Sequence, residues 1–102
     1  MRLFLLALLL GPFAETSREP EARSLLGRPL FAPAIPDERR LRLETNLAQA
    51  EKEARARPDD ADALIWLGRR TAYLGRFREA IAIFTRGIEK HPGDARFLRH
   101  RG

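Results

Sequence analysis

Two amphipathic segments between Asp60 and Pro92 dominate the pattern of hydrophobic and polar positions along the chain. In the first segment, apolar or small residues recur at i, i+3, i+4 and i+7, at Leu64, Leu67, Gly68 and Thr71. The second repeats this spacing and extends it by one turn, at Phe77, Ala80, Ile81, Phe84 and Ile88. Such a period is that of an α-helix with one buried face. Since Gly75 lies between the segments and Pro92 follows them, both helix-ending residues, the sequence predicts a helical hairpin.

A third helix is predicted before the hairpin, from about Glu38 to Arg57. Its apolar stripe has spacings of four, three and four residues, at Leu43, Leu47, Ala50 and Ala54. Three prolines within 27–40 disfavour a continuous helix there, so residues 15–36 are expected to form a proline-rich extended linker. After the hairpin, residues 95–102 begin the helical pattern again.

The hairpin resembles one tetratricopeptide repeat, a unit of about 34 residues. The resemblance rests on Leu67-Gly68, Gly75, Phe77, Glu79-Ala80-Ile81, Phe84 and Pro92. Three positions depart from the family pattern, with Leu64 for Trp, Thr71 for Tyr and Gly87 for Ala. Pro58 lies 34 residues before Pro92, and Gly102 lies 34 residues after Gly68. The resemblance therefore implies one complete repeat near 61–94 with partial repeats on both sides.

The fold class expected from this resemblance is all-α, a tetratricopeptide-like helical hairpin array that forms a fragment of a right-handed α-solenoid. The helical domain would span 37–102 and be incomplete at its C-terminus. Repeats of this kind bury a continuous core only by stacking on their neighbours.

The N-terminus is typical of a secretory signal peptide. Arg2 precedes an uninterrupted apolar run over 3–10, and Gly11-Pro12 ends the run well short of the roughly 20 residues that span a bilayer. We expect a signal peptide over 1–14, or to 22, and export to the periplasm or the medium.

The mature chain should then begin between Glu15 and Arg23, which N-terminal mass analysis would check. Recovery of an intact Met1 form from the cytoplasm would contradict export. An uncleaved segment that anchors the chain in a membrane and a buried apolar segment in a cytoplasmic protein are the alternatives.

The composition offers little for catalysis. The chain has 102 residues, enough for one small domain, and no cysteine, which excludes disulfides, thiolate metal sites and thiol nucleophiles. His91 and His100 have no neighbouring Ser or Cys and are expected at the surface. Asp59, Asp60 and Asp62 precede or begin a helix, where capping and the helix dipole favour them. We therefore expect no enzyme activity, no cofactor, no metal and no small-molecule substrate.

A candidate binding face lies on the first hairpin helix, about half a turn from its predicted core stripe. It comprises Asp62, Ile65, Trp66, Arg69 and Tyr73. The family resemblance places these side chains on the concave groove, where a partner peptide with acidic groups would lie. Trp, Tyr and Arg are frequent interface anchors. The predicted function is thus a protein or peptide interaction module with a scaffold or assembly role. In the competing structural interpretation, Ile65 and Trp66 pack against the helix at 38–57.

Two other functions stay open. The net charge of +5 comes from 17 Arg and 2 Lys against 14 acidic residues, so the chain could bind nucleic acid or another anionic surface. The arginines concerned are Arg69, Arg70, Arg76, Arg78, Arg96, Arg99 and Arg101. Only Trp66 and Tyr73 supply aromatic rings among them, which places this hypothesis behind peptide binding. The chain could also be a non-functional fragment of a longer repeat protein.

Overall fold

The computed structural model describes residues 19–102, which fall into two units divided between Phe31 and Ala32. The predicted signal segment, 1–14, lies outside the described residues. Within 19–102, none of the helices has the length and apolarity needed to cross a bilayer.

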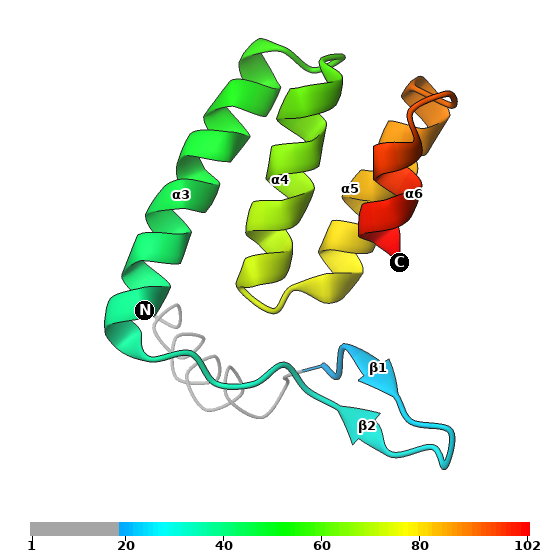
Figure 1. Ribbon diagram of the computed structural model, residues 1–102. Helices are drawn as coiled ribbons and strands as arrows, with labels where there is room; N and C mark the ends of the chain where they lie inside the picture. The colour runs from blue at the N-terminus through cyan, green and yellow to red at the C-terminus, as the bar shows by residue number, and fades with distance from the viewer. Residues whose placement is uncertain (1–18) are drawn as a thin grey trace, which may run out of the picture. The chain divides into compact units, whose positions relative to one another are not determined.

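The first unit contains a short β-hairpin (Figure 1). Strand β1 (Ala22–Arg23) pairs antiparallel with β2 (Pro29–Leu30). The Ser24 hydroxyl accepts hydrogen bonds from the backbone N–H groups of Leu26 and Arg28, and Gly27 takes a φ of 84° that L-residues rarely adopt. The extended linker expected over 15–36 thus contains a locally bonded turn that the prolines permit, because Pro29 lies at a strand end.

The second unit is helical. Its elements are α3 (Asp37–Ala56), α4 (Ala61–Tyr73), α5 (Phe77–Lys90) and α6 (Ala95–Arg101). The predicted helix at 38–57 is thereby confirmed to within one residue at each end. The two hairpin helices and a further helix after them are confirmed as elements. The coarse expectation of an all-α domain is also confirmed.

Local signals in the sequence explain where these helices begin and end. Helix α3 starts directly after Pro36, whose ring already fixes φ near −57°. The Asp60 carboxylate caps α4 by accepting the N–H of Ala63 at 2.9 Å, and Asp94 caps α6 by accepting the N–H of Arg96 at 3.1 Å. Gly75 has a φ of 79° in the turn between α4 and α5, the left-handed conformation that ends helices.

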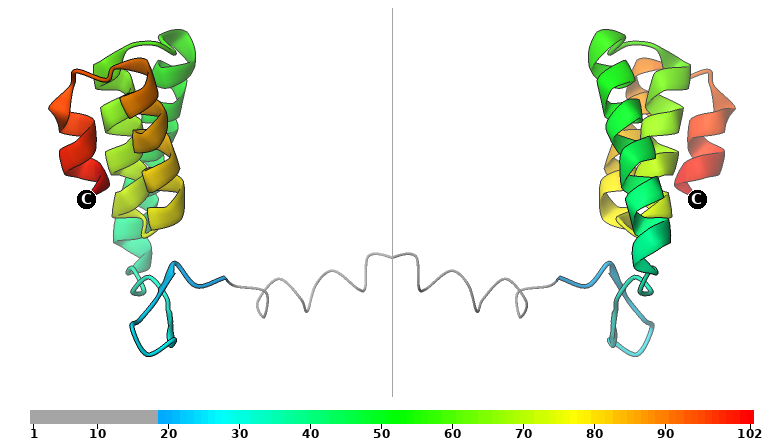
Figure 2. Two further views of the ribbon diagram at one scale, coloured as in Figure 1. Left: turned by 90° about the vertical axis from the view of Figure 1, so that its right-hand side faces the viewer. Right: turned by 90° about the vertical axis from the view of Figure 1, so that its left-hand side faces the viewer.

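Helix α4 is the centre of the packing (Figures 1 and 2). It contacts α3, α5 and α6, whereas α3 packs against no other helix of the unit. The buried cluster consists of Leu64, Ile65, Ala80, Phe84 and Phe97. Leu47 and Ala50 of the predicted α3 stripe are also buried.

Two glycines let the aromatic rings of this core approach a helix backbone closely. A Cβ on Gly68 would overlap the ring of Phe84, and a Cβ on Gly87 would overlap the ring of Phe97. Phe97 is the one described side chain of large volume that is fully buried. The α4–α5 and α5–α6 contacts therefore use the same device, a ring seated on a glycine.

The predicted stripe of α5 is only partly buried. Ala80 and Phe84 lie in the core, but Phe77 and Ile81 keep 42% and 47% of their surface exposed. The prediction that all five residues of the stripe are buried was therefore wrong for these two. Helical periodicity identifies an apolar face but does not say which part of that face another element covers.

Candidate functional site

The candidate site on the helical unit is a group of side chains in contact with Arg69 of α4. Its Nε and Nη2 atoms donate hydrogen bonds to the Tyr73 hydroxyl at 3.0 and 2.7 Å. The guanidinium carbon also lies 4.4 Å from the centroid of the Trp66 ring and 5.8 Å from that of Tyr73. Spacings of three and four residues put all three side chains on one helix face, so two aromatic rings fix the position of the Arg69 charge.

Both rings remain accessible. Trp66 is 41% and Tyr73 40% exposed, so each offers apolar surface beside a cation. A cation over an aromatic face at such a half-exposed site contributes about 0.5–1 kcal/mol. The arrangement is therefore pre-organised without being buried, which lowers the entropic cost of holding an arginine for a ligand.

Arg70 belongs to the same constellation, although sequence analysis did not include it in the binding face. Its guanidinium carbon lies 4.8 Å from the Trp66 centroid. The Cα atoms of Arg69 and Arg70 differ by about 100° around the helix, but the indole is wide and the arginine side chain long enough to bridge that angle. We call Trp66, Arg69, Arg70 and Tyr73 the Arg69 cluster.

Ile65 does not belong to the exposed face. It is 5% exposed and lies in the core cluster with Leu64 and Phe84. Ile65 is therefore part of the core rather than of the binding face predicted for it. The cluster draws its members from α4, α5 and α6, and not from the helix at 38–57 against which the competing interpretation packed this residue. A helix that is covered on more than one side has apolar residues beyond a single stripe.

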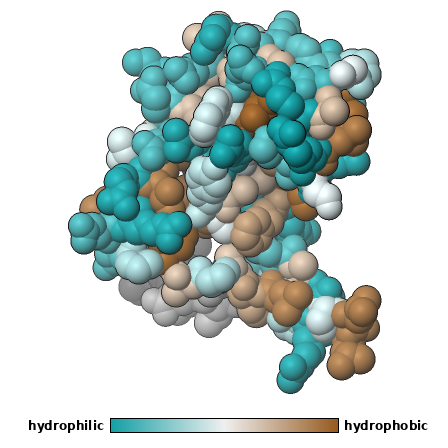
Figure 3. Space-filling view, in the orientation of Figure 1, coloured by the Kyte–Doolittle hydropathy of each residue, from teal (hydrophilic) through white to brown (hydrophobic). Residues whose placement is uncertain are grey.

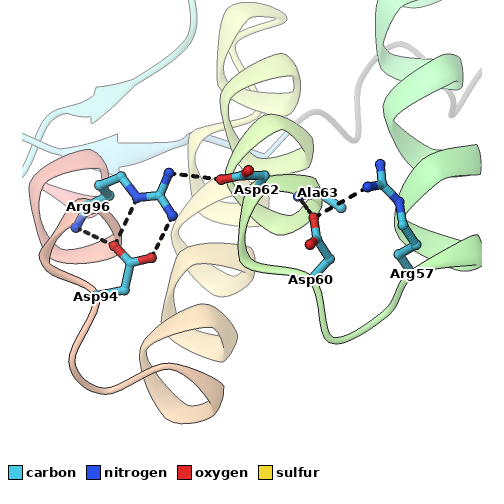
Figure 4. Close-up of polar contacts among 6 residues, drawn as sticks. All are labelled: Arg57, Asp60, Asp62, Ala63, Asp94 and Arg96. Carbon is cyan, nitrogen blue, oxygen red and sulfur yellow. Dashed lines mark hydrogen bonds and ion pairs between the residues drawn. The ribbon is translucent and has the colours of Figure 1, made fainter.

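Asp62 is engaged within the fold. Its carboxylate accepts a hydrogen bond from Nη1 of Arg96 at 2.9 Å, while Nε and Nη2 of Arg96 are bonded to Asp94 at 2.9 and 2.7 Å (Figure 4). One guanidinium thus ties the first turn of α4 to the start of α6. Asp62 therefore serves helix packing, and Arg96 is unsuited to an external phosphate because two carboxylates already hold it.

We call Asp62, Arg96 and Asp94 the Asp62–Arg96–Asp94 clamp. Its hydrogen bonds shift the pKa values of Asp94 and Arg96. Hydrogen bonding to Arg96 lowers the pKa of Asp94 to about 2, and hydrogen bonds from Asp94 and Asp62 raise the pKa of Arg96. A carboxylate whose folded pKa is depressed contributes stability above its unfolded pKa and loses that contribution as the pH falls through the folded value. The Asp94 carboxylate accordingly stays largely ionised until the pH approaches about 2.

The other acidic residues before α4 also have structural partners. Asp60 caps the helix and lies 3.8 Å from the Arg57 guanidinium, and Asp59 pairs with Lys90 at 2.8 Å. The interpretation of the acidic cluster as helix capping is therefore confirmed for Asp60 only, because Asp59 and Asp62 form ion pairs with residues of other segments. Within 19–102, His and acidic side chains nowhere form a group of three or more that could hold a metal ion.

The two histidines are less exposed than the sequence suggested. The His91 ring stacks on Phe97 at a centroid distance of 5.9 Å, with its Nε2 2.8 Å from the Asp59 carbonyl oxygen. His100 stacks on Phe84 at 5.7 Å. Both are half-buried, so the prediction of plain surface residues was wrong. Their aromatic partners come from segments that a local pattern does not connect.

The pKa of His100 is affected by its burial and by nearby arginines, Arg69 among them. Burial lowers its pKa, and the positive charges of Arg69, Arg99 and Arg96 lower it further. One cation of α4 and two of α6 therefore act on the His100 ring. Figure 3 shows that the surface in the orientation of Figure 1 is largely hydrophilic, with hydrophobic residues in separate patches.

A small hollow of about 220 Å³ adjoins the cluster on its α3 side. It is lined by Asn46, Gln49, Ala50, Glu53, Trp66 and Arg70. Side-chain amides can both donate to and accept from a peptide backbone. Trp66 thus lines a hollow shared with α3 and still presents surface to solvent, which combines the two interpretations made from the sequence.

Comparisons with protein-family models, with curated proteins and with solved structures each find no match for this chain.

Proposed function

We propose that the helical unit is a tetratricopeptide-like interaction module that binds an acidic segment of a partner protein at the Arg69 cluster. The observation that carries the proposal is Arg69 itself, held by the Tyr73 hydroxyl and the Trp66 ring while both rings stay exposed. A pre-positioned guanidinium favours a carboxylate, which it can bind through two parallel hydrogen bonds.

The helix arrangement supports the family part of the proposal. Helices α4 and α5 form the expected hairpin, and α6 packs against both, as the first helix of a following repeat would. Under this proposal, α3 is the second helix of a preceding repeat. The unit would be one segment of a right-handed solenoid in an exported protein with a scaffold or assembly role and no catalysis.

The hollow beside Trp66 suggests how the rest of the segment is held. Its amide groups, on Asn46 and Gln49, lie on α3, so they would receive the peptide backbone while Arg69 and Arg70 receive an acidic side chain or a C-terminal carboxylate. Nucleic acid is the alternative ligand. It is less favoured because the Asp62–Arg96–Asp94 clamp removes one of the seven arginines proposed for it.

The test is binding of a fluorescent acidic peptide with a C-terminal carboxylate to the full chain. We expect Arg69→Ala and Tyr73→Ala each to weaken binding about 30-fold, which corresponds to a central anchor worth about 2 kcal/mol. Arg42→Ala is the matched control, because Arg42 is an exposed arginine of α3 outside the cluster. Arg70 cannot serve as that control, since it stacks on the same indole.

Two results would contradict the proposal. An equal loss for Arg42→Ala would show that only net charge matters. Tighter binding of a single-stranded oligonucleotide, with an affinity that falls steeply as salt rises, would favour the nucleic-acid alternative.

Melting temperatures of Trp66→Ala and Leu64→Ala would be compared in parallel. An equal drop in both would identify Trp66 as part of the core.

A further inference from the structure

A second surface lies between α3 and α5. Both helices pack against α4 but not against each other, and the space between them is a groove of about 610 Å³ over α4. The lining residues come from α3, α4, α5 and the connections on either side of α4, and none of them belongs to the Arg69 cluster. The groove is therefore separate from the Arg69 cluster.

The interior of this groove is apolar. Leu64, Leu67 and Thr71 of α4 form its floor at i, i+3 and i+7, and Leu47, Ala54 and Ile83 line the adjacent walls. Leu47, Leu64 and Thr71 are buried, so the apolar surface open to a ligand comes from Ala54, Leu67 and Ile83, which are half-buried. The only polar side chain of the floor, Thr71, donates its hydroxyl to the Leu67 carbonyl at 2.7 Å. The floor thus presents no unpaired hydroxyl donor, so its complement is a row of aliphatic side chains.

The helices that line the groove determine which backbone conformation suits a bound peptide. All three walls are helices, whose N–H and C=O groups are bonded within each helix. An extended peptide over the floor would leave its own backbone groups without partners, whereas a helix satisfies them internally. The lining residues of α5 run from Glu79 to Lys90, which corresponds to about 16 Å at 1.5 Å per residue. This length matches about three turns of a docked helix.

The charges at the rim specify the flanks of that helix. Four basic side chains, Arg55, Arg76, Arg86 and Lys90, line the groove together with two acidic ones, Glu51 and Glu79. Lys90 is partly neutralised by Asp59, but the remaining balance is still positive. Acidic residues on both sides of an apolar stripe therefore match this rim better than basic residues do.

From these features we infer that the groove between α3 and α5 docks an amphipathic helix of a partner protein, with an aliphatic stripe flanked by acidic residues. This site is independent of the Arg69 cluster, and the two could hold different segments of one partner.

The test uses a fluorescent synthetic helix with leucines at i, i+3, i+4 and i+7 and glutamates beside them, titrated with the full chain. Ala82→Glu is the decisive variant, because Ala82 lines the groove and is exposed, so a charge there blocks the site without entering the core. Ala48→Glu adds the same charge at an exposed position of α3 outside the groove. We expect Ala82→Glu to weaken binding at least tenfold and Ala48→Glu to change it less than twofold, with equal melting temperatures.

Several outcomes would overturn the inference. One is that the peptide does not bind, and another is that Ala82→Glu binds it as the parent does. A lysine-flanked peptide that binds as tightly as the glutamate-flanked one would refute the charge argument. Equal binding of a peptide with a central proline would refute the requirement for a helix. Dimerisation of the parent chain that Ala82→Glu abolishes would identify a second copy as the occupant instead. Arg69→Ala should leave binding of this peptide unchanged, so this test and that of the Arg69 cluster can fail separately.

Discussion

Replacing Phe97 with alanine is expected to reduce the free energy of unfolding of the helical unit by about 3–5 kcal/mol, the usual cost of truncating a buried aromatic residue. Phe97 is completely buried, lies on Gly87 and stacks with His91. It is also the buried residue of a helix with only seven residues. Because so short a helix is unstable in isolation, loss of this ring should detach α6 from α4 and α5.

Leu98→Ala is the matched control for this substitution. Leu98 follows Phe97 directly but is 53% exposed, so its truncation should cost less than about 0.5 kcal/mol. Urea unfolding followed by circular dichroism gives both values. Similar losses for the two variants would mean that α6 is not held through Phe97.

The second large effect is expected for Gly87→Ala. In the middle of a helix this change normally gains up to about 1 kcal/mol from propensity. Here the new methyl group would overlap the ring of Phe97, which has no exposed surface into which to move. Overpacking of a core costs about 1–3 kcal/mol. We expect a net loss of about 1 kcal/mol, opposite in sign to the propensity effect.

Gly93→Ala tests this explanation. A Cβ on Gly93 would meet no atom within 4 Å, and its φ is not positive, so this change should be neutral or slightly stabilising. The double variant Gly87→Ala with Phe97→Leu should lose less than the sum of the two single variants, because the smaller side chain makes room for the methyl group. Additive losses in denaturant unfolding would argue against a direct clash.

The regular part of the fold could be predicted from the sequence because its signals are local. Proline, glycine and aspartate lie at the ends of α3, α4 and α5, and the predicted bounds of α3 were right to within one residue. The β-hairpin could not be predicted in this way. Its strands have two residues each, too few for a period of two, and its turn is closed by hydrogen bonds to the Ser24 hydroxyl as well as by backbone bonds.

The candidate site could be predicted only in part, because side-chain contacts between helices leave no local pattern. Trp66, Arg69 and Tyr73 follow from helical spacing alone. Ile65 is buried by residues of other helices, and Asp62 is bound by an arginine 34 residues further along the chain. Helical spacing predicts neither contact. Arg70 joined the cluster through the reach of its side chain, which an angle measured at Cα does not describe.

The order of the ring-on-glycine contacts has a consequence for synthesis on the ribosome. Gly68 precedes Phe84, and Gly87 precedes Phe97, so each receiving surface leaves the exit tunnel before the ring that it holds. Contacts between residues so close along the chain form quickly because little loop entropy is lost. A nascent chain that has emerged as far as Lys90 can already close the α4–α5 hairpin. Helix α6 can then pack against the completed hairpin, so the helices can assemble in the order in which they are translated.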